Sequence, residues 1–261
     1  MTTVRYPAVA GLFYPDDAVE LEEMLRQFLA AAKAHESVPK AIIVPHAGYV
    51  YSGPVAASAY RLLIPAKDKI KRVVLVGPAH RVAFRGLALP SVDAFVTPLG
   101  RVAVDREAIA QIVDLPGVLQ FDAAHAPEYG LEVQLPFLQE VLEDFKLVPI
   151  VVGAAKPEEV AEVLDRLWDG PETLIVVSSD LSHYLDYQTA KRVDSATSRA
   201  IEKLDPFGIP ADSACGAIPI SGLLRAARKH GLTAKTLDLR NSGDTNGPRD
   251  QVVGYGAYGF F

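Results

Sequence analysis

The sequence predicts an α/β fold: a single domain with a central, mostly buried sheet and helices on both faces. Short runs rich in Val, Ile and Leu recur at 41–44, 72–76, 146–152 and 173–177, and segments of helical periodicity lie between them. Continuous apolar runs are typical of strands covered on both faces, and strands that alternate with helices are typical of an α/β sheet.

The composition agrees with this fold class. The chain has 261 residues, of which 49% are hydrophobic and 22% are charged, so it can bury a sizeable core. It contains no internal repeat and no linker long enough to separate domains, so residues 1–261 are predicted to form one domain.

The predicted elements follow one another along the chain. The clearest helical pattern covers 17–33, where Leu21, Leu25 and Leu29 belong to a broad apolar face. The last segment, 252–261, alternates Val, Gly, Tyr and Ala and is predicted to be a final strand with close backbone approach at its glycines. Further helices are predicted at 54–63, 106–113, 132–142, 157–168, 189–204 and 220–230.

Charge and cysteine content exclude several classes of protein. A formal net charge of −6 argues against binding to nucleic acid, so the expected ligand is a small molecule or a peptide. The single cysteine, Cys215, excludes an intrachain disulfide, and the N-terminal residues lack the pattern of a secretory signal. No apolar run approaches the ~18 residues needed to span a membrane. These features predict a cytoplasmic protein without a membrane segment.

Polar side chains follow three of the predicted strands. His46, His80, Asp180 and His183 all come shortly after apolar runs. Because ligands in open α/β sheets bind beyond the carboxyl ends of the strands, these side chains are expected to share one cleft.

The two histidines suggest a metal site. Neutral imidazoles at neighbouring strand ends are suitable ligands for iron, copper or zinc, with Glu132, Asp180 or Cys215 as the third ligand. Cys215 precedes a predicted helix whose dipole would favour the thiolate. The alternatives are histidines that hydrogen-bond to the backbone and a cysteine that is a small buried apolar residue.

Asp180 and His183 form a candidate catalytic acid/base pair, since a carboxylate can orient an imidazole that moves a proton near neutral pH. Alternatively, the polar residues 178–180 cap a following helix. Tyrosines near these positions could line a substrate pocket together with Glu132, namely Tyr49, Tyr51, Tyr129 and Tyr184. In the string 125–137, Glu128 and Glu132 are expected on one face of a helix, with Glu128 facing solvent and Glu132 turned inward.

Several strings together resemble the Memo family, whose microbial members are called AmmeMemoRadiSam system protein B. In chain order they are PAVAGLFYP, PHAGYVYSG, GPAH, EVQLPFL, SSDLSH and CGAIPI. The resemblance covers essentially the whole chain and implies a fold similar to class III extradiol dioxygenases, which are non-haem iron enzymes. It also implies that His46, His80 and Cys215 are the metal ligands, and that His183 corresponds to the acid/base histidine of those dioxygenases.

The resemblance also sets the functional expectations. A cysteine in place of the dioxygenase carboxylate makes the site softer and favours copper(I) or thiolate-bound iron. Tyr129 stands where many relatives carry a histidine, whereas Glu132 matches. The expected function is a metal-dependent oxidoreductase, with AMMECR1-like and radical SAM proteins as partners. The alternative is a non-catalytic metal-binding or peptide-binding module that kept the dioxygenase pocket.

Overall fold

The computed structural model describes residues 3–33 and 37–261. Its strands are Val4–Arg5 (β1), Ala41–Val44 (β2), Arg72–Pro78 (β3), Leu87–Leu89 (β4), Ala94–Thr97 (β5), Gly100–Ala103 (β6), Val118–Gln120 (β7), Lys146–Val152 (β8), Thr173–Ser178 (β9), His183–Leu185 (β10), Ala234–Asn241 (β11) and Val252–Phe260 (β12). Its α-helices are Ala18–Ala31 (α1), Tyr49–Tyr60 (α2), Arg106–Ala110 (α3), Asp122–His125 (α4), Leu135–Val141 (α5), Pro157–Arg166 (α6), Tyr187–Glu202 (α7) and Ala217–Lys229 (α8). Short 3-10 helices lie at Arg61–Ala66, Glu132–Gln134, Pro206–Gly208 and Ser242–Asp244.

The predicted α/β architecture is confirmed, and the apolar runs form strands β2, β3, β8 and β9. Helix α1 shows why the local prediction succeeded. Asp17 caps it by accepting hydrogen bonds from the backbone N–H groups of Val19 and Glu20, and its leucines at four-residue spacing are buried.

Helices α2 and α5 begin at residues other than those predicted, and proline is involved in both. Helix α2 starts at Tyr49 and contains Pro54. The fixed φ of proline suits a helix, so Pro54 resembled a first helical residue. The predicted helix 132–142 is instead a 3-10 turn followed by α5, with Pro136 in the first turn of α5.

The large sheet has the strand order β10-β12-β2-β9-β3-β8-β4-β7, and β11 also pairs with β12. Strands β2, β9, β3 and β8 are parallel to one another, whereas β12 and β4 join this group in antiparallel orientation. Because the parallel strands lie side by side, the loops that follow β2, β9 and β3 emerge at the same edge of the sheet.

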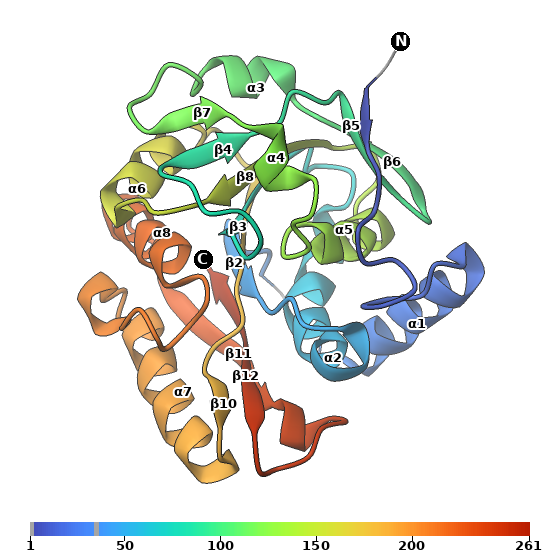
Figure 1. The fold of residues 1–261 in the computed structure, drawn as a ribbon, viewed down its shortest axis with the longest axis vertical. Coiled ribbons are helices and arrows are strands. Elements are labelled where there is room, and N and C mark those ends of the chain that lie inside the picture. The colour runs from blue at the N-terminus through green and yellow to red at the C-terminus, as the bar shows by residue number, and fades with distance from the viewer. Residues whose placement is uncertain (1–2, 34–36) are drawn as a thin grey trace.

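Helices cover both faces of the sheet (Figure 1). Helices α1, α2 and α5 pack together on one face, and α6 and α8 pack together on the other, beside α7. The strands between these layers carry fully buried Val, Ile and Leu side chains. A smaller sheet of order β1-β5-β6 lies next to this body, and the sequence did not reveal it because its strands are short.

Strand β12 lies between the outer strand β10 and the parallel strand β2. Its first residues pair with β10 and its last residues pair with β2, while β11 runs along its other edge. Gly254 allows close packing here, because a Cβ at this position would lie 2.1 Å from Oδ2 of Asp194. Within the described residues, no helix is both long enough and apolar enough to cross a bilayer.

Candidate metal centre

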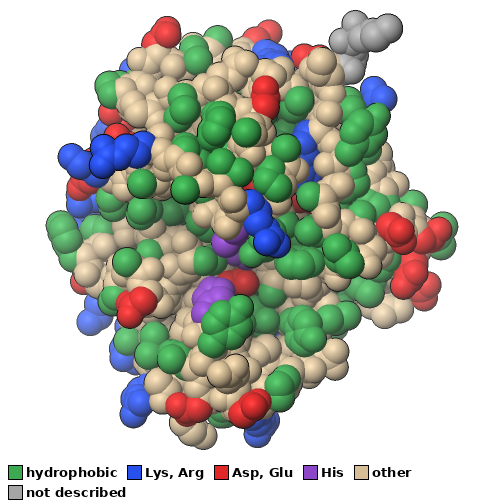
Figure 2. Space-filling model, in the orientation of Figure 1, with side chains coloured by type: hydrophobic (Ala, Val, Ile, Leu, Met, Phe, Trp, Pro, Cys, Tyr) green, Lys and Arg blue, Asp and Glu red, His purple; other side chains and the backbone are tan. Residues whose placement is uncertain are grey.

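Three side chains from distant parts of the sequence meet at the carboxyl edge of the parallel strands. His46 and His80 each follow their strand by two residues, and Cys215 lies just before α8, which packs on β3 and β9. The ligand atoms of the three residues all lie within 4.8 Å of one another. Nε2 of His46 is 3.1 Å from Sγ of Cys215. Figure 2 shows histidine side chains in a hollow at the middle of this face of the molecule.

The hydrogen bonds around His46 fix its tautomer. The Ser178 hydroxyl donates to the Gly130 carbonyl and accepts a hydrogen bond from Nε2 of Gln134. Its proton is therefore already used, so the contact of 2.9 Å with Nδ1 of His46 requires Nδ1 to be the donor. The lone pair of His46 then lies on Nε2, which faces Cys215.

His80 is oriented in the same way by a carboxylate. Glu128 accepts hydrogen bonds from Nδ1 of His80 at 2.7 Å and from the backbone N–H groups of His80 and Gly130. Burial raises the pKa of Glu128, but the hydrogen bonds from His80 and Gly130 outweigh burial and leave it below its usual value. An ionised Glu128 keeps the proton of His80 on Nδ1, so Nε2 of this ring also carries a lone pair.

The pKa values keep the pair of His46 and Cys215 uncharged. Burial, with a further contribution from the charge of His80, lowers the pKa of His46 to about 3. Burial, assisted by the negative charge of Asp180, raises the pKa of the Cys215 thiol to about 12. The expectation that the helix dipole favours a thiolate is therefore corrected, because burial outweighs it. An imidazolium–thiolate pair, as in cysteine nucleophiles, is not formed here.

Asp180 and His183 lie at the same edge but are not bonded to each other as an acid/base pair. The Asp180 carboxylate accepts the backbone N–H of His46 at 2.7 Å, and burial raises its pKa to about 6. It therefore holds the loop that carries His46. His183 begins β10 opposite Val253, and its charge influences the pKa values of both His46 and Asp180. Residues 178–180 cap no helix, because strand β10 follows them.

The tyrosines predicted to line a pocket have different environments. Tyr129 stacks on the His80 ring, with 4.7 Å between ring centroids and 19° between planes. Tyr51 and Tyr184 are 37% and 71% exposed. Tyr49 is buried, and its hydroxyl donates to the Val133 carbonyl. The expectation that Tyr49 lines a pocket is therefore corrected.

Glu132 requires the same correction. It is fully buried, and it forms an ion pair with Arg5. Its oxygens also accept hydrogen bonds from the backbone N–H groups of Ala8 and Val9 and from the Tyr14 hydroxyl. Glu132 thus turns inward as expected, but it anchors the N-terminal segment and is neither a metal ligand nor a pocket residue.

Sequence reasoning missed the residues that orient the two imidazoles. Glu128 was expected in solvent on a helix, but it is 2% exposed and precedes the helical segment. Ser178 was interpreted only as a helix cap. Gly130 could have been found from the sequence, because a glycine can indicate close approach of other groups to the backbone. A Cβ at this position would lie 3.3 Å from Nδ1 of His46 and 3.4 Å from Cε1 of His80.

The donor set fits a transition-metal ion on chemical grounds. Two imidazole nitrogens with free lone pairs and one sulfur converge, and each imidazole donates its other N–H to an oxygen acceptor. This outer arrangement is typical of histidines that bind metals in proteins. A bound cation would also replace the thiol proton of Cys215.

Comparison with known proteins finds relatives along nearly the whole chain. A sequence model of the family described as "Memo-like protein" matches residues 5–258. The chain is 38% identical over 264 residues to a MEMO1 family protein of Aquifex aeolicus, and the match covers 97% of both chains. It is 37% identical over 270 residues to a MEMO1 family protein of Archaeoglobus fulgidus, again covering 97% of both. The chain therefore belongs to the Memo family.

Proposed function

We propose that the protein binds one transition-metal ion through Nε2 of His46, Nε2 of His80 and Sγ of Cys215. The observation that supports this best is the pair of hydrogen bonds from the Nδ1 atoms to Ser178 and Glu128, since together they turn both free lone pairs toward the cysteine. A purely structural role for the histidines would not require that arrangement.

The chemistry of these ligands favours a redox-active ion. Two imidazoles and a thiolate form a softer set than two imidazoles and a carboxylate, which suits copper(I) or thiolate-bound iron. Such an ion, when bound, would supply one-electron chemistry. We therefore propose a metal-dependent oxidoreductase related to the extradiol dioxygenases, acting on a small molecule.

The protein's own residues would hold the site and move a proton. Asp180 fixes the backbone at His46, while Ser178 and Glu128 fix the two rings. His183 is the candidate proton carrier, because it is partly exposed at the same edge of the sheet and is not bonded to the proposed ligands.

Metal content tests the first part of the proposal. After anaerobic purification, Cys215→Ser and His46→Ala should each hold much less metal than the parent at equal protein concentration, because each loses one of three protein ligands. His230→Ala is the matched control, since this histidine stacks on Trp168 and lies at the C-terminal end of α8, whereas Cys215 lies just before its start. If Cys215→Ser and His46→Ala both retain metal like the parent, the site lies elsewhere.

Oxygen consumption with a panel of catechols tests the second part. A proton-transfer group typically contributes ~10²–10⁴-fold to rate, so His183→Ala should keep its metal and lose turnover by that factor. A protein that holds metal but consumes no oxygen with any member of the panel would favour the non-catalytic metal-binding or peptide-binding module.

Partnership with AMMECR1-like and radical SAM proteins stays a prediction, and co-purification of the three would test it.

A further inference from the structure

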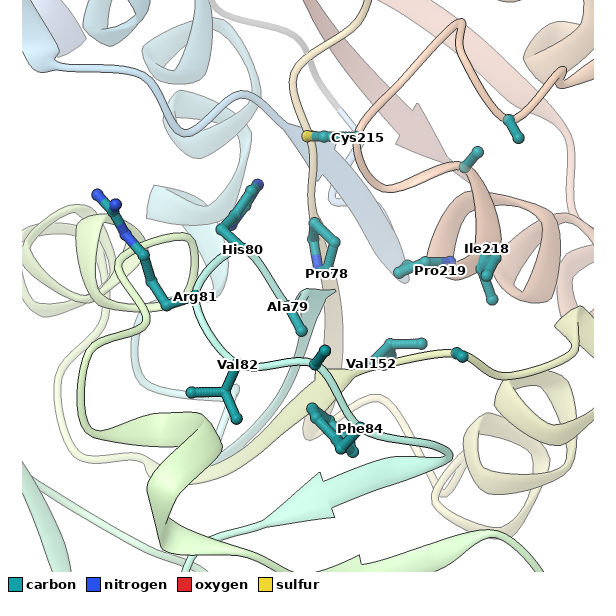
Figure 3. Close-up of a pocket in the computed structure, with 15 residues that line it drawn as sticks. Pro78, Ala79, His80, Arg81, Val82, Phe84, Val152, Cys215, Ile218 and Pro219 are labelled. Carbon is teal, nitrogen blue, oxygen red and sulfur yellow. The ribbon is translucent and has the colours of Figure 1, made fainter.

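A pocket of ≈ 470 Å³ opens directly beside two of the proposed metal ligands, His80 and Cys215. This size lies within the range of small-molecule sites, ~300–1,000 Å³. Phe84, Val152 and Ile218 also line the pocket, and Figure 3 shows the first two at the lower centre and Ile218 at the right, whereas His80 and Arg81 lie at the left. The pocket thus has an apolar wall and a polar wall.

The polar wall ends in a fixed cation, Arg81. Its guanidinium lies 5.4 Å from the centre of the Tyr129 ring, and Tyr129 in turn stacks on His80. Stacking limits the freedom of the guanidinium at the rim, and Arg81 as a residue remains exposed. Within residues 3–33 and 37–261, Arg81 forms no ion pair.

The nearby carboxylates are already used. Glu128 accepts hydrogen bonds from His80 and Gly130, and Asp180 accepts the backbone N–H of His46. Neither forms an ion pair with Arg81, so in the described part of the chain the guanidinium at the pocket mouth remains available to an anionic ligand.

We propose that this pocket binds a small apolar acid, with its anionic oxygens on Arg81 and its apolar body against Phe84, Val152 and Ile218. The inference rests on the proposed function in one respect, namely that the substrate would reach the metal ligands His80 and Cys215 through this pocket. A carboxylate and a phosphate can each accept two parallel hydrogen bonds from an arginine guanidinium. The proposed ligand class is therefore any small apolar molecule that carries one of these oxyanions.

Calorimetric titration tests the proposal with 2-naphthoate, 2-naphthyl phosphate and the neutral 2-naphthamide as probes. The full-length chain is titrated both as purified and after chelator treatment, so that binding of the acids to a metal ion is separated from binding to Arg81. We expect an acid to bind about 10-fold more tightly than the amide in both forms, because a hydrogen bond to a charged group is worth about a factor of ten or more. Comparison of the two acids shows which oxyanion is preferred.

Arg81→Gln should abolish this difference between acid and amide. The matched control is Arg85→Gln, because Arg85 is an exposed arginine on the same loop and does not line the pocket. Ile218→Trp, which fills the apolar side, should weaken the acid and the amide alike.

Equal affinity for acid and amide in the parent, or an equal effect of Arg81→Gln and Arg85→Gln, would overturn the proposal. Metal content measured on the same samples reports separately on the proposed function. Arg81-dependent binding in a protein that holds no metal even before chelator treatment would therefore contradict only the metal site.

Discussion

Glu128 and Glu132 lie four residues apart and are both buried, yet they serve two different regions of the molecule. Glu128 faces the cleft and orients His80. Glu132 binds Arg5 instead, together with backbone N–H groups of the N-terminal segment. A buried carboxylate needs several donors to remain charged, and each glutamate finds them in a different partner segment. Burial alone therefore does not indicate which carboxylate belongs to a functional site.

The largest effect is expected from Glu132→Gln. Without this carboxylate the buried Arg5 guanidinium has no counter-charge, so the free energy of unfolding should fall by about 3–5 kcal/mol, as measured by urea denaturation. Glu140→Gln, which removes one of the two carboxylates paired with the exposed Arg26, is the control and should cost less than about 1 kcal/mol. Metal content per folded molecule should match the parent. Equal losses in the two variants would show that Glu132 has no special structural role.

A third buried carboxylate, Asp194, extends the comparison because it accepts fewer hydrogen bonds than Glu128 or Glu132. It accepts the backbone N–H of Ser182, and burial raises its pKa to about 6. Since the folded-state pKa exceeds the unfolded value, its stabilising contribution is complete below about pH 4 and is lost as the pH rises through about 6. The shift corresponds to a loss on the order of 3 kcal/mol.

Asp194→Asn should therefore gain stability relative to the parent between pH 4 and pH 7.5 in urea denaturation, since Asn keeps an acceptor for Ser182 without a charge. Asp186→Asn is the control of opposite sign. Hydrogen bonds from Thr189 lower the pKa of Asp186, so the advantage of the parent over this variant should be constant between pH 4 and pH 7.5 and should shrink only as the pH falls below about 4. An unchanged difference between Asp194→Asn and the parent would mean that Asp194 titrates normally.

Glu128→Gln tests the cleft side of the comparison. The amide cannot accept all the hydrogen bonds that orient His80, so we expect metal affinity to fall ~10–100-fold, as measured by competition with a chromophoric chelator. Glu132→Gln should leave the affinity of the folded protein unchanged. If both variants bind metal equally well, the two carboxylates do not differ as proposed.

The smallest effect is expected at Tyr129. Tyr129→Ala removes the ring that stacks on His80 and should lower the free energy of unfolding by about 1 kcal/mol. Tyr129→Phe should match the parent, because the Tyr129 hydroxyl forms no hydrogen bond within the described part of the chain. Urea midpoints distinguish the two variants. A loss in Tyr129→Phe as large as in Tyr129→Ala would assign the effect to the hydroxyl instead of the ring.

The sequence by itself determined the central sheet and the edge at which the site lies. The apolar runs that became β2, β3, β8 and β9 are long enough to identify without any partner. A residue just beyond the end of a parallel strand must emerge at the carboxyl edge, so His46 and His80 could be assigned to one cleft. The strings that resemble the Memo family pointed to Cys215 as well.

Only the tertiary structure decided which groups surround those residues. Glu132 meets Arg5, which is 127 residues away, and Cys215 meets His46, which is 169 residues away. Whether the Cys215 thiol is ionised depends on how deeply such contacts bury it, and not on its place before a helix. Periodicity and capping are local properties of a chain, whereas burial and the identity of a hydrogen-bond partner arise from long-range packing, which one sequence does not specify.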